Sequence, residues 1–114
     1  MTIATKRVYD DAAHGDGYRV LVDRLWPRGV SKERAHVDVW LRDVGPSDEL
    51  RRWFHHEARL FEEFADRYRA ELATNPAVET LRGIVRSHDV VTLVYSARDA
   101  EHNQAVVLRD YLSD

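Results

Sequence analysis

Residues 90–99 read VVTLVYSARD, a stretch whose first six positions are almost continuously apolar and β-branched. A run of this kind is typical of a strand that is buried on both faces, as in a parallel sheet covered by helices. The short loop 96–99 follows, and Asp99 is placed to cap a final helix whose buried row is Ala105, Leu108 and Leu112. The stretch therefore predicts a central strand followed by a loop and a helix.

Three earlier segments also have the pattern of strands. Residues 3–8 predict a first strand, residues 18–23 a second and residues 37–44 a third. The second alternates between two faces, with Tyr18, Val20 and Val22 on one side and Arg19, Leu21 and Asp23 on the other. The alternation predicts a strand that ends at Asp23.

Helical patterns fill the region between the third strand and the last. Ser47 is a suitable N-cap for a helix with an apolar face, a second helix is expected near residues 59–73, and Asn75-Pro76 starts a third. Alternation of strands and helices predicts the α/β class. We expect a single three-layer domain over residues 1–114, with a mostly parallel, Rossmann-like central sheet flanked by helices.

Two loops leave the carboxyl ends of predicted strands: DRLWPRG at residues 23–29 and YSARD at residues 95–99. If their strands are parallel neighbours, both loops emerge at the edge where open α/β sheets bind ligands. The second loop also opens a helix, whose first N–H groups favour an anion. We therefore expect one arginine-lined pocket that binds an anionic small molecule. The predicted ligand-binding residues are Arg24, Trp26, Arg28, Ser96, Arg98 and Asn103.

A purely structural role would also explain the charged residues of these two loops. Asp23 could pair with Arg98, or Arg24 with Asp99, and such ion pairs would join the two loops without any ligand. Arginine–aspartate pairs between loops are common, and a charged pair in a cleft is only a candidate for function. Both interpretations remain open from the sequence.

Composition excludes several classes of chemistry. The chain has no cysteine, so disulfides, thiolate nucleophiles and thiolate metal sites are excluded. The formal net charge of −3 disfavours nucleic-acid binding, which usually needs a basic excess. No apolar run is long enough to span a bilayer, and no signal peptide is apparent at residues 1–8. We expect a cytoplasmic protein without a cofactor, a metal or a membrane partner.

Four stretches resemble the YeaO-like proteins of the domain-of-unknown-function 488 family. They are GYRVLVDRLWPRG (17–29), WLRDVGPSDELRRWF (40–54), TLVYSARD (92–99) and EHNQAVVL (101–108). The resemblance implies a three-layer α/β fold in a bacterial or archaeal cytoplasmic protein, and no established activity. Longer relatives carry a Cys-His-Arg stretch near the last helix, where this chain has His102-Asn103-Gln104. Thiol or metal chemistry is therefore not transferred from those relatives.

Two residues are candidates for proton transfer, Asp23 and His102. Ser96, His102 and Asp23 contain the residue types of a nucleophilic triad, but no G-x-S-x-G turn surrounds Ser96. A histidine at a helix start more often caps the helix or faces solvent.

Two further motifs have simple structural interpretations. The pair His55-His56 has no zinc-binding spacing and is expected to end a helix. The pair Arg51-Arg52 fits an ordinary mixed-charge surface.

Three functions compete at this point. The first is a small enzyme or ligand-gated protein that acts on a nucleotide or phosphorylated metabolite, and it requires both loops to face one cavity. The second is a non-catalytic module that binds a protein partner, and it requires an exposed apolar patch. The third, nucleic-acid association, requires a contiguous basic stripe and is the weakest. The unusual density of tryptophan, proline and arginine in residues 24–28 favours the first.

Overall fold

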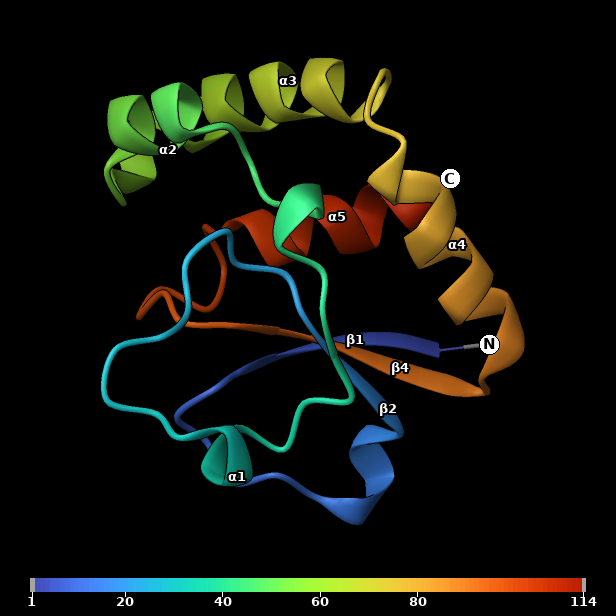
Figure 1. Cartoon of the computed structure of the whole chain (residues 1–114). Helices are drawn as coiled ribbons and strands as arrows, with labels where there is room; N and C mark the ends of the chain where they lie inside the picture. Colours follow the sequence, from blue (N-terminus) through green and yellow to red (C-terminus); the bar gives the residue numbers. More distant parts are fainter. Residues whose placement is uncertain (1, 114) are drawn as a thin grey trace.

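A four-stranded parallel sheet forms the centre of the computed structural model, which describes residues 2–113 (Figure 1). β4 (Val90–Tyr95) lies between β1 (Thr2–Arg7) and β2 (Tyr18–Leu21). β3 (Val39–Trp40) pairs with the other side of β2, which gives the order β1-β4-β2-β3. The predicted parallel sheet with a buried final strand is confirmed. The Rossmann-like detail is not, since a dinucleotide-binding sheet places its first strand beside its second.

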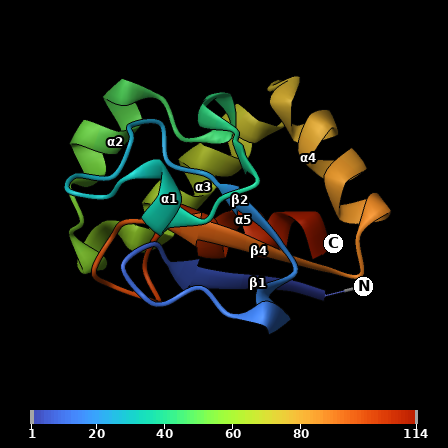
Figure 2. The same ribbon diagram turned by 60° about the horizontal axis from the view of Figure 1, so that its bottom comes forward.

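Helices cover one face of the sheet much more heavily than the other (Figures 1 and 2). Within residues 2–113, none of them is both long and apolar enough to cross a bilayer. The heavily covered face carries α2 (Asp48–Phe54), α3 (Phe61–Leu72), α4 (Ala77–Ser87) and α5 (Gln104–Ser113). The other face carries α1 (Lys32–Ala35) and the chain around it. Three 3₁₀ turns complete the fold: η1 (His14–Asp16), η2 (Arg42–Val44) and η3 (Ala58–Leu60).

Local side-chain chemistry sets where two of the helices begin. The Ser47 hydroxyl accepts a hydrogen bond from the Leu50 amide at 3.1 Å, so Ser47 caps α2 as predicted. The cap of α5 differs from the prediction. Asp99 accepts from the amides of Glu101 and His102 in the preceding loop, and α5 begins only at Gln104. The Asn103 side chain, which accepts from Val106 N at 3.1 Å, occupies the capping position instead.

The third strand is much shorter than the predicted segment 37–44. Only Val39 and Trp40 pair with β2, and the chain then turns into η2. This turn directs Val44 into the core, where it is fully buried. An extended strand through residue 44 would have carried the chain past the core, so burial of Val44 explains the early end.

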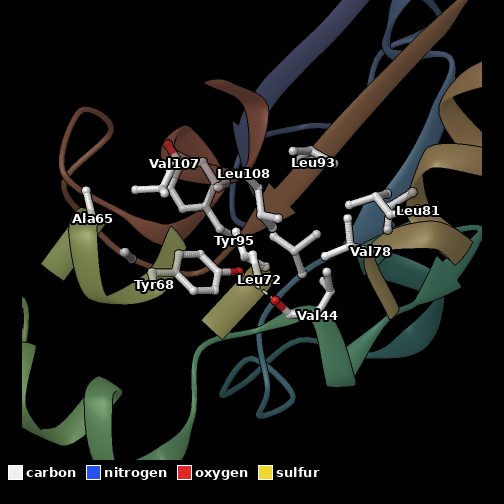
Figure 3. Close-up of a cluster of buried hydrophobic side chains, with 14 of the residues drawn as sticks. Val44, Ala65, Tyr68, Leu72, Val78, Leu81, Leu93, Tyr95, Val107 and Leu108 are labelled. Atoms are coloured by element: carbon white, nitrogen blue, oxygen red, sulfur yellow. Dashed lines mark hydrogen bonds between the residues drawn. The ribbon is translucent and has the colours of Figure 1, made fainter. Parts of the chain in front are cut away.

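Two hydrophobic clusters lie on opposite faces of the sheet. The larger packs α2–α5 against residues such as Val20, Leu93 and Tyr95. Figure 3 shows Leu93 and Tyr95 within this cluster. The smaller packs Leu21 and Val94 against α1 and its flanking loops. The alternation predicted for residues 18–23 is therefore seen, because Val20 and Leu21 enter different clusters.

Tyr68 carries a polar group into the larger cluster. Its side chain is completely buried, and its hydroxyl donates a hydrogen bond to the Val44 carbonyl at 2.6 Å (Figure 3). Burial raises the pKa of Tyr68 well above its usual value, so the group stays a neutral donor. This bond fixes the turn at η2 to the middle of α3.

We expect Tyr68→Phe to lower the free energy of unfolding by about 1 kcal/mol, because it leaves the buried Val44 carbonyl without this donor. Urea unfolding would measure the loss. Tyr111→Phe is the control, since the hydroxyl of Tyr111 makes no hydrogen bond within residues 2–113 and the residue is only half-buried. Equal stability of both variants would contradict the importance of the Tyr68 bond.

Candidate functional site

The two loops selected from the sequence open at the same edge of the sheet. β2 and β4 are hydrogen-bonded parallel neighbours, with Leu21 opposite Val94, so the chain leaves both strands in the same direction. A cavity of about 410 Å³ lies between the loops, and residues 23–28 and 96–97 form much of its lining. Its size falls within the usual range for small-molecule sites.

The cavity brings together some of the predicted site residues and not others. Its lining includes Asp23, Arg24, Trp26, Arg28 and Ser96. Three predicted residues, Arg98, His102 and Asn103, are outside the lining found among residues 2–113. Residues that the sequence analysis did not select also line it: Tyr9, Pro46, Arg51, His56 and Gln104.

Asp23 is the buried carboxylate of this cavity, with only 7% of the residue exposed. One carboxylate oxygen accepts from the Ser96 amide at 3.0 Å, and the other accepts from the Gln104 side-chain amide. Burial raises the pKa of Asp23 above its usual value, although these hydrogen bonds and the nearby His56 oppose the rise. The folded protein therefore keeps a poorly solvated carboxyl group at the cavity.

This pKa shift predicts a pH-dependent effect of Asp23→Asn. Because the pKa of Asp23 is raised by folding, the folded protein binds this proton more tightly than the unfolded chain. The carboxylate therefore destabilises the fold at neutral pH, and the penalty disappears as pH falls through the raised pKa towards the unfolded value of about 3.9. We expect the melting temperature of Asp23→Asn, relative to the wild type, to be highest at pH 7 and to fall towards pH 4, whatever constant cost arises because asparagine has one acceptor for the two donors of Ser96 and Gln104. Thermal unfolding at a series of pH values measures it, and a difference that is constant with pH would contradict it.

Arg24 turns away from Asp23 towards the start of α2. Its Nε and Nη2 atoms donate to the carbonyls of Pro46 and Gly45, each at 2.8 Å. These bonds fix the plane of the guanidinium at the cavity wall. Nη1 has no hydrogen-bond acceptor within residues 2–113, so it remains available to a ligand.

Arg51 and Arg28 add two further guanidinium groups. Arg51, on α2, makes a partly exposed ion pair with Asp48 at 3.2 Å, yet its Nε atom is buried and has no hydrogen-bond partner in the described chain. Arg28 is exposed at the cavity, and its carbonyl accepts from the Tyr9 hydroxyl at 2.8 Å. Arg51 therefore forms the mixed-charge pair that the sequence suggested, and it also lines the cavity.

The ion pairs that would have joined the loops are not formed. Within residues 2–113, neither Arg24 nor Arg98 contacts a carboxylate closely enough for an ion pair. Asp99 instead lies 2.8 Å from the His102 ring, and its pKa is lowered by the Glu101 amide and by His102. Asn103 donates to the Asp99 carbonyl at 2.8 Å. Asp99, His102 and Asn103 thus stabilise their own turn beside the cavity.

Trp26 forms a wall of the cavity. Its indole N–H donates to the Val30 carbonyl at 2.7 Å, and its ring meets Trp40 edge-on at 5.4 Å between centroids. Both contacts hold the ring in the smaller hydrophobic cluster. This packing fixes Trp26 as a wall of the cavity.

His55 and His56 end α2 in an unusual backbone conformation. Their φ angles are 45° and 56°, a left-handed region that costs energy for residues other than glycine. The expected helix end after Phe54 is confirmed. The strained turn brings His56 into the cavity lining. No signal in the sequence predicted this placement, because many helices end without glycine.

Comparison with known proteins shows relatives across the whole chain. A family profile described as the inactive DUF488-N3 subclade matches residues 2–114. Uncharacterized protein YeaO of Escherichia coli (strain K12) is 44% identical over 112 residues, which cover 98% of this chain and 97% of the relative. An uncharacterized protein of Mycobacterium tuberculosis (strain ATCC 25618 / H37Rv) is 43% identical over 111 residues, 97% of this chain and 93% of the relative. No solved structure matches the chain.

Proposed function

The chain belongs to the family described as the inactive DUF488-N3 subclade, and from that premise we propose that it binds an anionic small molecule without turning it over. The ligand would be a nucleotide or another phosphorylated metabolite. The observation that carries the proposal is the lining of the cavity at the carboxyl ends of β2 and β4, which contains three arginines and a single carboxylate, Asp23. Guanidinium groups suit phosphate because several N–H donors lie in one plane.

The hydrogen bonds around the arginines support an anion in this place. Arg24 is already oriented by two backbone carbonyls, so little side-chain freedom would be lost when a ligand binds. The buried Nε of Arg51 has no acceptor in the described part of the chain, and a buried donor of this kind is costly. An anionic oxygen would supply the missing acceptor.

Binding is favoured over catalysis for a geometric reason as well. A serine nucleophile needs a base within hydrogen-bond reach. The Ser96 amide donates to Asp23, and the Ser96 side chain also interacts with this carboxylate, but the His102 ring bonds to Asp99 outside the cavity lining and does not reach the serine. The triad considered from the sequence is therefore not assembled, which agrees with the description of the family as inactive.

The protein-interaction alternative predicted an exposed apolar patch. Among residues 2–113, Leu25 is the one large hydrophobic residue that is exposed, with 55% of its surface accessible to solvent. Single exposed hydrophobic residues are normal on soluble proteins and do not indicate an interface. The anion site is therefore the better supported of the two functions.

Thermal-shift measurements with inorganic phosphate, sulfate, ribose 5-phosphate and adenosine monophosphate test the proposal. A ligand at a hundred times its dissociation constant stabilises the fold by roughly 2.7 kcal/mol, which is a shift of several degrees for a domain of this size. We expect Arg28→Ala and Arg51→Gln each to weaken phosphate binding by about tenfold or more, as loss of a charged hydrogen bond does.

Arg52→Gln is the matched control, since Arg52 follows Arg51 on α2 but is exposed and outside the cavity lining. It should bind phosphate like the wild type. If no phosphate compound shifts the melting temperature, or if Arg51→Gln and Arg52→Gln behave alike, the proposed anion site is wrong.

A further inference from the structure

Asp23 and Arg24 are neighbours in the chain but lie on different walls of the cavity. Hydrogen-bond donors hold Asp23, and hydrogen-bond acceptors hold Arg24. The Asp23 carboxylate is held by the Ser96 amide and the Gln104 side chain, which belong to the segment from β4 to α5. The Arg24 guanidinium is held by the carbonyls of Gly45 and Pro46, which lead into α2. The cavity therefore presents hydrogen-bond acceptors on the β4–α5 side and charged donors on the α2 side.

The Asp23 carboxylate has acceptor capacity that the protein does not use. An ionised carboxylate offers about four lone-pair sites on two oxygens. Within residues 2–113, one oxygen accepts from the Ser96 amide and the other from Gln104, and the Ser96 side chain lies beside the carboxylate as a further donor that lowers its pKa. These two bonds also fix the plane of the carboxylate. It is thus preorganised to accept from two adjacent donors of a ligand.

The charges around Asp23 select neutral donors. An ammonium group would pair with the carboxylate but would also meet Arg24, Arg28 and Arg51 in the same cavity, and like charges repel. Hydroxyl groups donate hydrogen bonds without that repulsion. Two neighbouring hydroxyls match the two fixed oxygens of Asp23.

The charge of the cavity lining suits a phosphate monoester. Its three arginines and one carboxylate leave an excess of two positive charges, although Arg51 also pairs with Asp48 outside the lining. A phosphate monoester carries a charge of about −1.5 to −2 near neutral pH. A carboxylate ligand would balance only half of the positive charge.

Resting on the function proposed above, we propose that the ligand is the phosphate monoester of a sugar. Its phosphate binds Arg24, Arg28 and Arg51, and two adjacent sugar hydroxyls donate to the carboxylate of Asp23. Asp23 is then a specificity-determining residue, because it distinguishes a sugar phosphate from other phosphate monoesters. This role also explains why a buried carboxylate is present in a cavity otherwise suited to anions.

Isothermal titration calorimetry with two ligands tests the inference. Ethyl phosphate has the monoester charge but no hydroxyl, whereas ribose 5-phosphate has both. We expect the wild-type protein to bind ribose 5-phosphate at least about tenfold more tightly than ethyl phosphate, and Asp23→Asn to remove most of this preference. Asp99→Asn, at the same edge but outside the cavity lining, should keep it. Adenosine monophosphate and its 2′,3′-dideoxy analogue form a second pair, which shows whether the sugar is recognised within a nucleotide.

The outcomes separate this inference from the proposed function. If ethyl phosphate and ribose 5-phosphate bind equally well to the wild type, the role of Asp23 is overturned while the arginine site stands. If neither binds, both proposals fail. If Asp23→Asn is folded by circular dichroism and retains the wild-type preference, the hydroxyls are recognised elsewhere and the inference is wrong. The wild-type comparison requires no variant, so the test does not depend on the folding of Asp23→Asn.

Discussion

Gly17→Ala is expected to destabilise the protein by roughly 3–5 kcal/mol, the largest effect that we predict for a single methyl group. Gly17 has a φ angle of 65° and a ψ angle of −137°, a combination that is essentially restricted to glycine. A β-carbon at this position would overlap the Val90 carbonyl oxygen and crowd the Val90 side chain. The clash involves backbone, which cannot move aside as a flexible side chain would.

The position of Gly17 makes the clash severe. Gly17 precedes β2, and Val90 begins β4, the strand paired with β2 at the centre of the sheet. Relief of the overlap would separate these two strands at their amino-terminal ends. Domains of this kind are stabilised by only about 5–15 kcal/mol. For a wild-type stability near the lower end of that range, such a loss leaves a substantial fraction of the variant unfolded.

Thermal unfolding followed by circular dichroism measures the effect, with an expected fall in melting temperature of more than about 10 °C. Gly15→Ala is the matched control, because Gly15 lies two residues earlier and a β-carbon there would meet nothing within 4 Å. We expect that variant to stay within about 0.5 kcal/mol of the wild type. Similar melting temperatures for the two variants would refute the steric argument.

The sequence predicted the elements of the fold well where burial and periodicity agree. β4 was recognisable because it is buried on both faces, and the faces of β2 because they alternate. The prediction was wrong for β3, where residues 37–44 have the alternation of a strand but only Val39 and Trp40 pair. What ends β3 is a requirement of the tertiary structure, the burial of Val44 beside Tyr68, which local pattern does not contain.

The site was predictable only in part, for a related reason. Residues 23–28 and 96 could be placed at one sheet edge because parallel neighbouring strands end together. Arg51 and His56 come from α2 and the turn after it, and their approach to the cavity depends on how α2 packs over the sheet. That packing has no signature in residues 48–56 beyond an apolar face. Likewise, Asn103 was expected to bind a ligand, and only the structure shows its amide used within the turn that starts α5.

Arg19→Met is expected to cost about 3–5 kcal/mol, because it removes one partner of a buried ion pair. Arg19 is 4% exposed, and its guanidinium donates to Asp16 at 2.6 Å and to the carbonyls of Ala35 and His36 at 2.9 Å. Methionine fills a similar volume but provides no donor. The change would leave the two carbonyls without these donors and Asp16 with a weakened set of partners.

The network around Arg19 joins several parts of the fold on the sheet face that carries α1. Asp16 also accepts from Lys6 of β1 at 3.0 Å, and its carbonyl accepts from Thr92 of β4 at 2.7 Å. Through Arg19, these strands are tied to α1, whose last carbonyls receive the guanidinium. Loss of Arg19 should therefore loosen the thin layer around α1 first.

The pH dependence of stability distinguishes the ion pair from simple packing. Burial alone would raise the pKa of Asp16, but hydrogen bonds from the Ala13 amide, Lys6 and Arg19 lower it below its usual value. A carboxylate with a lowered pKa stabilises the fold above the unfolded pKa of about 3.9, and this contribution is lost as pH falls through the folded pKa. Arg19→Met should thus be much less stable than the wild type at pH 7, and the difference should shrink below pH 4. Arg69→Met, which removes an exposed partner of Asp66 on α3, should change stability by less than about 0.5 kcal/mol at either pH. A deficit of Arg19→Met that is the same at pH 7 and pH 3 would mean that the carbonyl bonds, and not the charge of Asp16, account for the stability that Arg19 provides.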